Sequence, residues 1–182
     1  MSDYIDALVE KEEWAYNELV RDYSKKIFNL CFYILHDRKD AEDLTQEVFI
    51  SIFQSIGSFR QESKLSTWIY RLTVNKCSEK LRYQSRTKRK GNLVSIEQLF
   101  EIKNFEISPE EKLIKKQEYD ALFQAIRLLP DNQRIAYTMH NMEEYSYNEI
   151  AQSMDLSLSA VESLIFRAKK NLKISLLSYF ND

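Results

Sequence analysis

Glycine and proline are scarce in this sequence, and their scarcity constrains the fold more than any other feature. The chain has two glycines and two prolines among 182 residues, far below ordinary usage. Tight turns between strands depend on these residues, so a sheet-rich fold would lack its connections. A hydrophobic fraction of 44% is enough for packed cores. We therefore predict an all-α protein, whose length allows one domain or two small ones.

Residues 146–177 have the pattern of two helices joined by a tight turn. Ser146 followed by Glu149 is a capping-box spacing, which satisfies free amide groups at a helix start. After a short break, a second helix start is indicated at Ser157 or Ser159. Apolar residues recur at helical spacing in both parts: Tyr147, Ile150, Ala151 and Met154 in the first, then Leu158, Val161, Leu164, Ile165, Ala168 and Leu172.

The opposite face of the second predicted helix is polar and basic. It carries Ser159, Glu162, Ser163, Phe166, Arg167, Lys169, Lys170 and Lys173. A short helix packed on a longer one that exposes cations and an aromatic ring is what a helix-turn-helix presents to the DNA major groove. An ordinary helical hairpin with a solvated, lysine-rich face has the same pattern. The residues alone leave both interpretations open.

Charge is segregated along the chain, although the formal net charge is only −2. Residues 1–50 hold twelve acidic residues against six basic ones, whereas residues 60–90 hold ten basic residues against two acidic ones. A basic segment in a chain that is not basic overall predicts a local surface for a polyanion.

A break at residues 36–40 precedes a predicted helix that begins near Asp40. Its inward face is formed by Ala41, Leu44, Val48, Ile52 and Ile56. Its outward seam carries Asp43, Gln46, Glu47 and Ile50. Such a seam is either ordinary solvated surface or an acidic docking face for a basic partner. The sequence pattern does not choose between these two interpretations.

Gly57 ends that pattern, and a polar loop leads into another predicted helix that starts near residue 66. One stripe of this helix carries Arg71, Asn75, Ser78, Arg82 and Arg86. Cations beside an aromatic residue suit single-stranded nucleic acid, because cations follow the phosphates and unstacked bases need a π-face or a pocket. Trp68 is more simply explained as a core residue, whereas Phe59 suits either burial or base stacking.

Residues 87–108 lack sustained periodicity and are predicted to form a flexible linker with one short helix at 96–100. Pro109 suits the first position of the next helix, and Glu110 and Glu111 suit its positive end. The chain is therefore predicted to form two small helical domains, residues 1–86 and 109–182, joined by this linker.

Several kinds of site lack support in the sequence. Cys31 and Cys77 form no CxxC pair, and His36 and His140 have no neighbouring ligand spacing, so we expect buried thiols, no metal site and no cofactor. No nucleophile with a base and no carboxylate pair stands out, so we expect no catalytic residues. Without a long apolar run or a signal peptide, the default expectation is a cytoplasmic protein that does not insert into membranes.

Three segments, taken together and in order, resemble the signature regions of the extracytoplasmic-function sigma factors of bacterial RNA polymerase. The resemblance covers roughly residues 10–86 and 109–175. It implies that residues 1–86 form sigma region 2 and residues 109–182 form sigma region 4, and it implies a protein that is not an enzyme. The segments are DAEDLTQEVFISIF, SFRQESKLSTWIYRLTVNKC and LPDNQRIAYTMHNMEEYSYNEIAQSMDLSLSAVESLIFRAKKNLK.

The resemblance also implies a role for each face that the residues leave open. The implied core-polymerase-binding residues are Asp40, Asp43, Gln46, Glu47 and Ile50. The implied contacts to the melted minus-ten promoter element are Phe59, Arg60, Lys64, Arg71, Asn75 and Arg82. The implied contacts to the minus-thirty-five element are Ser159, Glu162, Ser163, Phe166, Arg167, Lys169 and Lys170. The implied partners are core RNA polymerase, promoter DNA and an anti-sigma factor, commonly one tethered in the membrane.

The sequence departs from the family pattern at the start of the last helix. Glu162 and Leu164 stand where many relatives carry a basic residue, and Ser159 and Ala160 replace a frequent glycine and threonine. Glu162 could accept a hydrogen bond from a cytosine amino group, or it could lower non-specific DNA affinity. The promoter sequence is therefore not predicted.

Two other classes of protein remain as alternatives at this stage. A stand-alone helix-turn-helix regulator of duplex DNA explains residues 146–177 but gives no role to the basic stripe after Arg60 or to the helix after Asp40. An all-helical adaptor would carry its basic stripes only as solvated faces, and its binding would be insensitive to salt.

Overall fold

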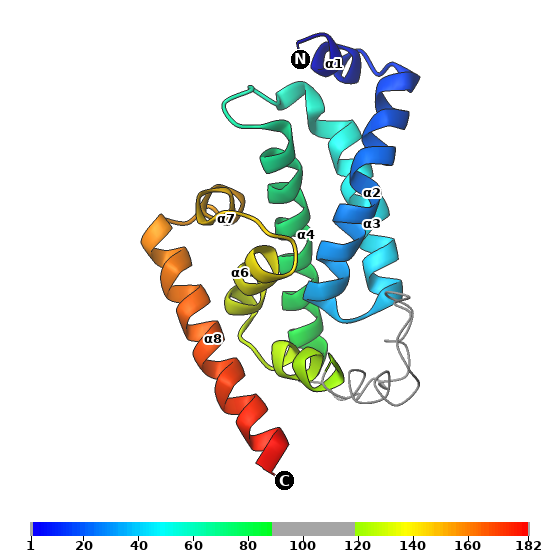
Figure 1. Cartoon of the computed structure of the whole chain (residues 1–182). Coiled ribbons are helices and arrows are strands. Elements are labelled where there is room, and N and C mark those ends of the chain that lie inside the picture. Colours follow the sequence, from blue (N-terminus) through cyan, green and yellow to red (C-terminus); the bar gives the residue numbers. More distant parts are fainter. Residues whose placement is uncertain (1, 89–118, 182) are drawn as a thin grey trace, which may run out of the picture.

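The computed structural model describes residues 2–88 and 119–181, which form two helical regions (Figure 1). The first contains α1 (Ser2–Val9), α2 (Glu13–Leu35), α3 (Arg38–Ser55), the short 3-10 turn η1 (Ile56–Ser58) and α4 (Leu65–Lys88). The second contains a helical segment at residues 119–127, then α6 (Asp131–Asn141), α7 (Tyr147–Met154) and α8 (Leu158–Asn181). Within the described ranges there is no strand, and the predicted all-α class is confirmed.

Local backbone signals set the boundary between α2 and α3. His36 adopts a left-handed conformation, with φ of 56°, and its N–H donates to the Phe32 carbonyl at the end of α2. Asp37 then caps α3, because its carboxylate accepts a hydrogen bond of 2.8 Å from the backbone N–H of Asp40. The break predicted over residues 36–40 is therefore shorter than expected, and α3 begins at Arg38.

The predicted start of the linker also differs from the structure. Helix α4 begins at Leu65 and continues through Lys88, past residue 87, where the linker was expected to begin. The rest of the predicted linker, the short helix expected at 96–100 and the helix start at Pro109 lie outside the described residues.

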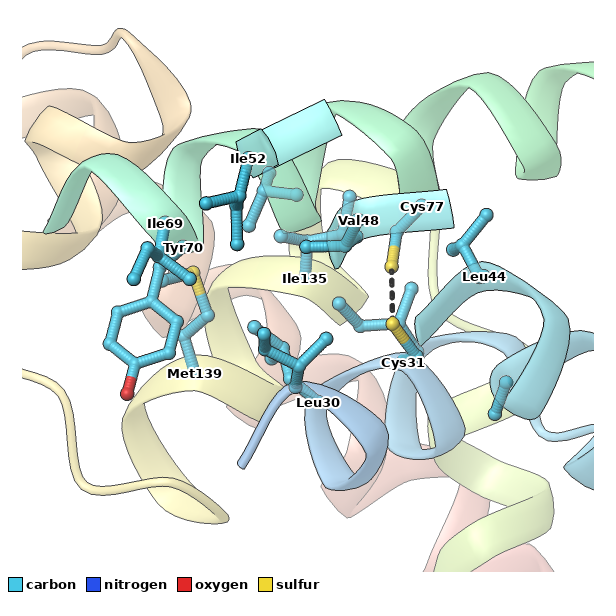
Figure 2. Packing of buried hydrophobic residues seen from close by; sticks show 14 of the residues in the cluster. Leu30, Cys31, Leu44, Val48, Ile52, Ile69, Tyr70, Cys77, Ile135 and Met139 are labelled. Atoms are coloured by element: carbon cyan, nitrogen blue, oxygen red, sulfur yellow. Dashed lines mark hydrogen bonds between the residues drawn. The ribbon is translucent and has the colours of Figure 1, made fainter. Parts of the chain in front are cut away.

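Helices α2, α3 and α4 pack around an apolar core, and α1 lies over one end (Figure 1). Leu30 of α2, Val48 and Ile52 of α3 and Ile69 of α4 are fully buried and face one another (Figure 2). Burying one such side chain stabilises the fold by about 1.5–3 kcal/mol. The helical periodicity of the sequence predicted this inward face of α3 correctly.

The second region packs directly against the first. Helix α6 contributes Ile135 and Met139 to the same buried cluster that contains Leu30 and Ile69 (Figure 2), and α7 contributes Ile150. Helix α8 lies on the far side of α6 and α7 from α2 and α3 (Figure 1). The two regions thus share one buried cluster, which the linker composition did not indicate, and the second region also has a smaller cluster of its own.

The two cysteines are free thiols inside this core, as expected. Cys31 of α2 and Cys77 of α4 are both buried, and their sulfur atoms lie 3.8 Å apart (Figure 2). Burial, followed by the contact with Cys31, raises the pKa of Cys77 well above its ordinary value. A thiol that stays protonated is a poor nucleophile and metal ligand, so the pair serves as packing.

The buried imidazole of His36 predicts acid sensitivity. Burial, with Arg134 and Arg127 adding to it, lowers the pKa of His36 to about 3 from its ordinary 6.5. The unfolded chain then binds a proton that the folded chain excludes, so the free energy of unfolding falls as the pH falls from 6.5 toward 3. Each pH unit in that window costs up to about 1.4 kcal/mol.

The substitution His36→Asn tests this effect, because asparagine tolerates the left-handed backbone and does not titrate. We expect urea unfolding followed by circular dichroism to show a smaller loss of stability for the variant than for the wild type between pH 7 and about pH 4.5. Both proteins contain the same carboxylates, so the contribution of these groups drops out when the slopes of unfolding free energy against pH are compared. Parallel pH profiles for the two proteins would contradict the prediction.

Candidate polymerase and nucleic-acid interfaces

Helices α7 and α8 form the predicted helix-turn-helix. Ser146 Oγ accepts a 3.3 Å hydrogen bond from the Glu149 N–H, and Glu149 Oε2 accepts a 3.1 Å bond from the Ser146 N–H, which completes the capping box. Asp155, with φ of 55°, ends α7. Ser157 Oγ then accepts a 3.3 Å bond from the Ala160 N–H. The start signal of α8 is therefore Ser157 and not Ser159.

The outer face of α8 is fully available at the surface of this structure. The expected minus-thirty-five residues are all exposed, and Phe166 has 71% of its surface exposed. On the opposite side, Val161, Ile165 and Ala168 are buried against the rest of the second region. Leu158 was expected to point inward, but it is 43% exposed because it is the first residue of the helix, beside the turn. An exposed aromatic ring among cations can contact DNA without rearrangement of α8.

The predicted stripe on α4 is also at the surface. Arg71, Asn75, Arg82 and Arg86 are exposed, and Ser78 is half-buried. The guanidinium Nε of Arg82 donates a 3.2 Å hydrogen bond to the Ser78 carbonyl, which holds it along the helix. The stripe therefore offers cations and an amide in one line, as binding along a phosphate backbone requires.

The loop before α4 holds two aromatic side chains together. The Phe59 and Trp68 ring centroids lie 5.4 Å apart in a tilted arrangement, and both side chains are half-buried at the edge of the core. Arg60 and Lys64, the cations expected to act with them, are exposed. Trp68 thus takes part in packing, while Phe59 combines partial burial with partial access to solvent.

The outward seam of α3 is exposed at most of its expected positions. Asp43, Gln46, Glu47 and Ile50 are exposed, and Ile50 has 55% of its surface accessible. An accessible apolar residue beside acidic ones is the composition of a docking surface with a polar rim.

Asp40 differs from the rest of that seam, because it is half-buried and makes both an ion pair and a hydrogen bond to α4. Its carboxylate lies 2.7 Å from Lys80 Nζ and accepts a 2.8 Å hydrogen bond from Gln84 Nε2. The hydrogen bond that Lys80 Nζ donates to the Asp40 carboxylate is the main cause of the raised pKa of Lys80. Glu47 lies 3.7 Å from Lys76 of α4. The basic residues of α4 therefore lie on two faces, one that contacts α3 and one that is exposed to solvent. The spacing of Lys76, Lys80 and Gln84, four residues apart, indicates that these three share a face.

Two of the expected minus-ten cations face acids of the second region. Lys64 Nζ lies 3.8 Å from Glu149 Oε1, and Arg71 Nη2 lies 3.7 Å from Asp155 Oδ2. The two partners of each contact are far apart in the sequence, so no local pattern could have predicted either contact.

Residues 2–88 and 119–181 contain no group of three His, Cys, Asp or Glu side chains placed to hold a metal ion. In the same part of the chain, no helix combines the length and the apolar character needed to cross a bilayer.

Comparison with known families now defines the class of protein. The sigma-70 region 2 model matches residues 19–87, and the sigma-70 region 4 model matches residues 119–172. The chain is 31% identical over 179 residues to the ECF RNA polymerase sigma-E factor of Haemophilus influenzae, covering 92% of each protein. It is 30% identical over 171 residues to the RNA polymerase sigma-H factor of Pseudomonas aeruginosa, covering 91% of this chain and 88% of that one.

Solved structures have the same fold. CnrH in complex with the cytosolic domain of CnrY matches with a TM-score of 0.69 and 16% identity over 96% of both chains. The sigma factor RpoE of Bartonella quintana, in complex with the anti-sigma factor NepR, matches with a TM-score of 0.69 and 19% identity, over 88% of this chain and 96% of that one. The two helical regions and their family matches define a sigma-70-type factor. More narrowly, the chain belongs to the extracytoplasmic-function (ECF) sigma factors, which bind core RNA polymerase and promoter DNA and direct transcription initiation.

A stability measurement separates the structural role of Asp40 from that of its exposed neighbour. Asp40→Asn should lower the free energy of unfolding by about 1 kcal/mol, because it weakens a charge-assisted contact between α3 and α4 that is partly exposed to solvent. Asp43→Asn is the matched control, since Asp43 is exposed on the same helix. Urea denaturation at neutral pH measures both variants. Equal midpoints for the two variants would show that the Asp40 contact does not stabilise the fold.

Proposed function

We propose that three faces of this sigma factor have separate roles in initiation. The α3 seam docks on core RNA polymerase, the α4 stripe with the preceding loop holds the melted minus-ten strand, and the outer face of α8 reads the minus-thirty-five element. The observation that carries the proposal is that all three faces are exposed in one structure, with Phe166 and its neighbouring cations on α8. The polymerase performs the phosphodiester chemistry, so the protein itself is not an enzyme.

The docking face is supported by its mixed chemistry. Ile50 supplies apolar area, and Asp43 and Glu47 supply charge that complements a basic partner. Asp40 contributes indirectly, because its contacts with Lys80 and Gln84 fix the start of α3 against α4. We therefore assign binding to Asp43, Gln46, Glu47 and Ile50, and positioning to Asp40.

The minus-ten surface combines cations with an aromatic edge. Arg71, Asn75 and Arg82 follow one line on α4, and Phe59 lies beside Trp68 at the end of that helix where the loop enters. Opening base pairs costs a few kcal/mol, and capture of an unstacked base offsets part of that cost only for the bases that fit. Strand separation thereby becomes dependent on sequence.

The minus-thirty-five surface has few residues that can specify sequence. Lys169 and Lys170 suit phosphate contacts, which position the domain, whereas Arg167 and Glu162 have groups that can read base edges. Glu162 is exposed on the same face, so either of its expected effects is compatible with its position.

Regulation and location follow from the same assignment. RpoE of Bartonella quintana was solved with the anti-sigma factor NepR, and CnrH with the cytosolic domain of CnrY. We propose an anti-sigma partner for this chain as well, tethered in the membrane in the manner the family resemblance implies, and action in the cytoplasm, where the polymerase is. Residues 1–86 and 109–182 are the proposed functional regions, with the linker running along the polymerase.

The direct test adds the purified protein to bacterial core RNA polymerase that lacks any sigma subunit. We expect the two to co-elute and to start transcription at fixed positions on genomic DNA fragments, and alignment of the start sites then gives both promoter elements. Tight binding to a palindrome without polymerase would instead favour a stand-alone helix-turn-helix regulator. Failure to bind core polymerase from a matched source, with a folded sample, would contradict the assignment of the α3 seam.

The substitution Arg167→Ala tests the α8 face. Loss of a side chain that reads a base edge costs about 1–3 kcal/mol, so initiation from promoters that depend on the upstream element should fall roughly 5- to 150-fold. Core-polymerase affinity should not change. Lys173→Ala is the control, because Lys173 is exposed on the same helix but lies outside the assigned contact set. If initiation falls equally in both variants, Arg167 makes only a general phosphate contact and does not read a base.

A further inference from the structure

The three acids of the α3 seam differ in their contacts with α4. Asp40 forms a close pair with Lys80, whose Nζ lies 2.7 Å from the Asp40 carboxylate, and only 25% of the Asp40 side chain is exposed. Asp43 is exposed and forms no ion pair within the part of the chain that the structure describes. Glu47 is intermediate, because its Oε2 lies 3.7 Å from Lys76 Nζ while 56% of its side chain stays exposed. Of the three, Glu47 is therefore the acid that is paired within the protein and also open to a partner.

The contact between Lys76 and Glu47 is an ion pair without the distance of a hydrogen bond. A hydrogen bond between such groups spans about 2.7–3.2 Å, which is shorter than the 3.7 Å observed. Lys76 therefore holds the Glu47 side chain in one orientation only weakly, although its charge still attracts the carboxylate. Only 33% of the Lys76 side chain is exposed, so it is partly buried where α4 meets α3. The pair thus reduces the negative charge that Glu47 presents more than it orients the side chain.

Lys80 acts on the same acids but is less suited to a test. Its pKa is raised first by the hydrogen bond to Asp40, and then, against the effect of burial, by the charges of Asp40, Asp43 and Glu47. Such attraction is mutual, so Lys80 also offsets part of the negative charge of the seam. Removing Lys80 would break a close contact between α3 and α4. Lys76 can be changed with little effect on the fold, because exposed ion pairs contribute little to stability.

We propose that Lys76 limits the affinity of this sigma factor for core RNA polymerase, because it competes with a cation of the polymerase for Glu47. A cation that bonds the Glu47 carboxylate would come within about 7 Å of the Lys76 ammonium, less than the Debye length of about 8 Å at physiological salt. The two like charges then repel. A bidentate arginine would also need Oε2, the oxygen that Lys76 approaches. This inference rests on the proposed docking role of the α3 seam and names a residue of α4 that sets the strength of docking.

The substitution Lys76→Gln tests the competition, because it removes the charge and keeps a polar side chain. We expect the full-length variant to bind core polymerase about two- to fivefold more tightly than the wild type, with the largest gain at low salt. Competition against fluorescently labelled wild-type protein for limiting core polymerase measures the affinity. Lys76→Arg keeps the charge and should bind like the wild type. Weaker binding by Lys76→Gln would show that Lys76 positions Glu47, and unchanged binding would show no effect, so either result overturns the proposal.

A double-mutant cycle assigns the effect to Glu47. Glu47→Gln should weaken binding, and Lys76→Gln added to it should give little further change, because the carboxylate for which Lys76 competes is absent. An equal gain from Lys76→Gln in both backgrounds would overturn the competition for Glu47.

The substitution Lys25→Gln is the matched control for net charge. Lys25 is exposed on α2 and lies outside the α3 seam. Its variant should bind core polymerase like the wild type, and a gain equal to that of Lys76→Gln would overturn the proposal in favour of a general charge effect.

The same cycle separates this inference from the proposed function. If Glu47→Gln leaves the affinity for core polymerase unchanged, the docking role assigned to Glu47 fails, and the inference about Lys76 fails with it. If Glu47→Gln weakens binding but Lys76→Gln does not tighten it, the docking role stands and only the inference fails.

Discussion

The packing of α4 against both regions is the interaction on which the rest of the structure depends. Cys77 lies against Cys31 of α2, and Tyr70 lies against Tyr145, which precedes α7. Ile69, Val74 and Leu81 of α4 are buried in the same cluster, and α4 contacts α2, α3, α6 and α7. A helix of 24 residues used in this way has one stripe left for solvent. That stripe carries Arg71, Asn75 and Arg82, so its proposed DNA surface is held by the same packing that builds the core.

The periodic and capping signals were sufficient to predict most helices. The Ser146 and Glu149 pair predicted the start of α7, and the apolar spacing from Val161 to Leu172 predicted which face of α8 is buried. Both signals are local, since each depends on residues within a few turns of one helix. The exposed residues on the outer face of α8 follow from the same spacing, because a helix that buries one stripe must expose the other.

The contacts that sequence reasoning missed all join residues far apart in the chain. Asp40 looked like part of a docking seam, but its partners Lys80 and Gln84 lie on another helix. Asp155 lies in the short break predicted between the last two helices, and its contact with Arg71 depends on how the two regions pack. Periodicity states which side of a helix is polar, but it does not state what that side will face. Leu158 is a further example. Its spacing predicted burial, but it is exposed because of the turn beside it.

Charge that is segregated in the sequence is compensated in space. Lys64, Arg71, Lys76 and Lys80 belong to the basic segment, and each lies within 4.0 Å of an Asp or Glu carboxylate from elsewhere in the chain. The pairs with Asp40 and Glu47 join two helices of the first region, whereas those with Glu149 and Asp155 join the two regions. Since the second region is held by apolar packing, screening by salt alone does not remove it.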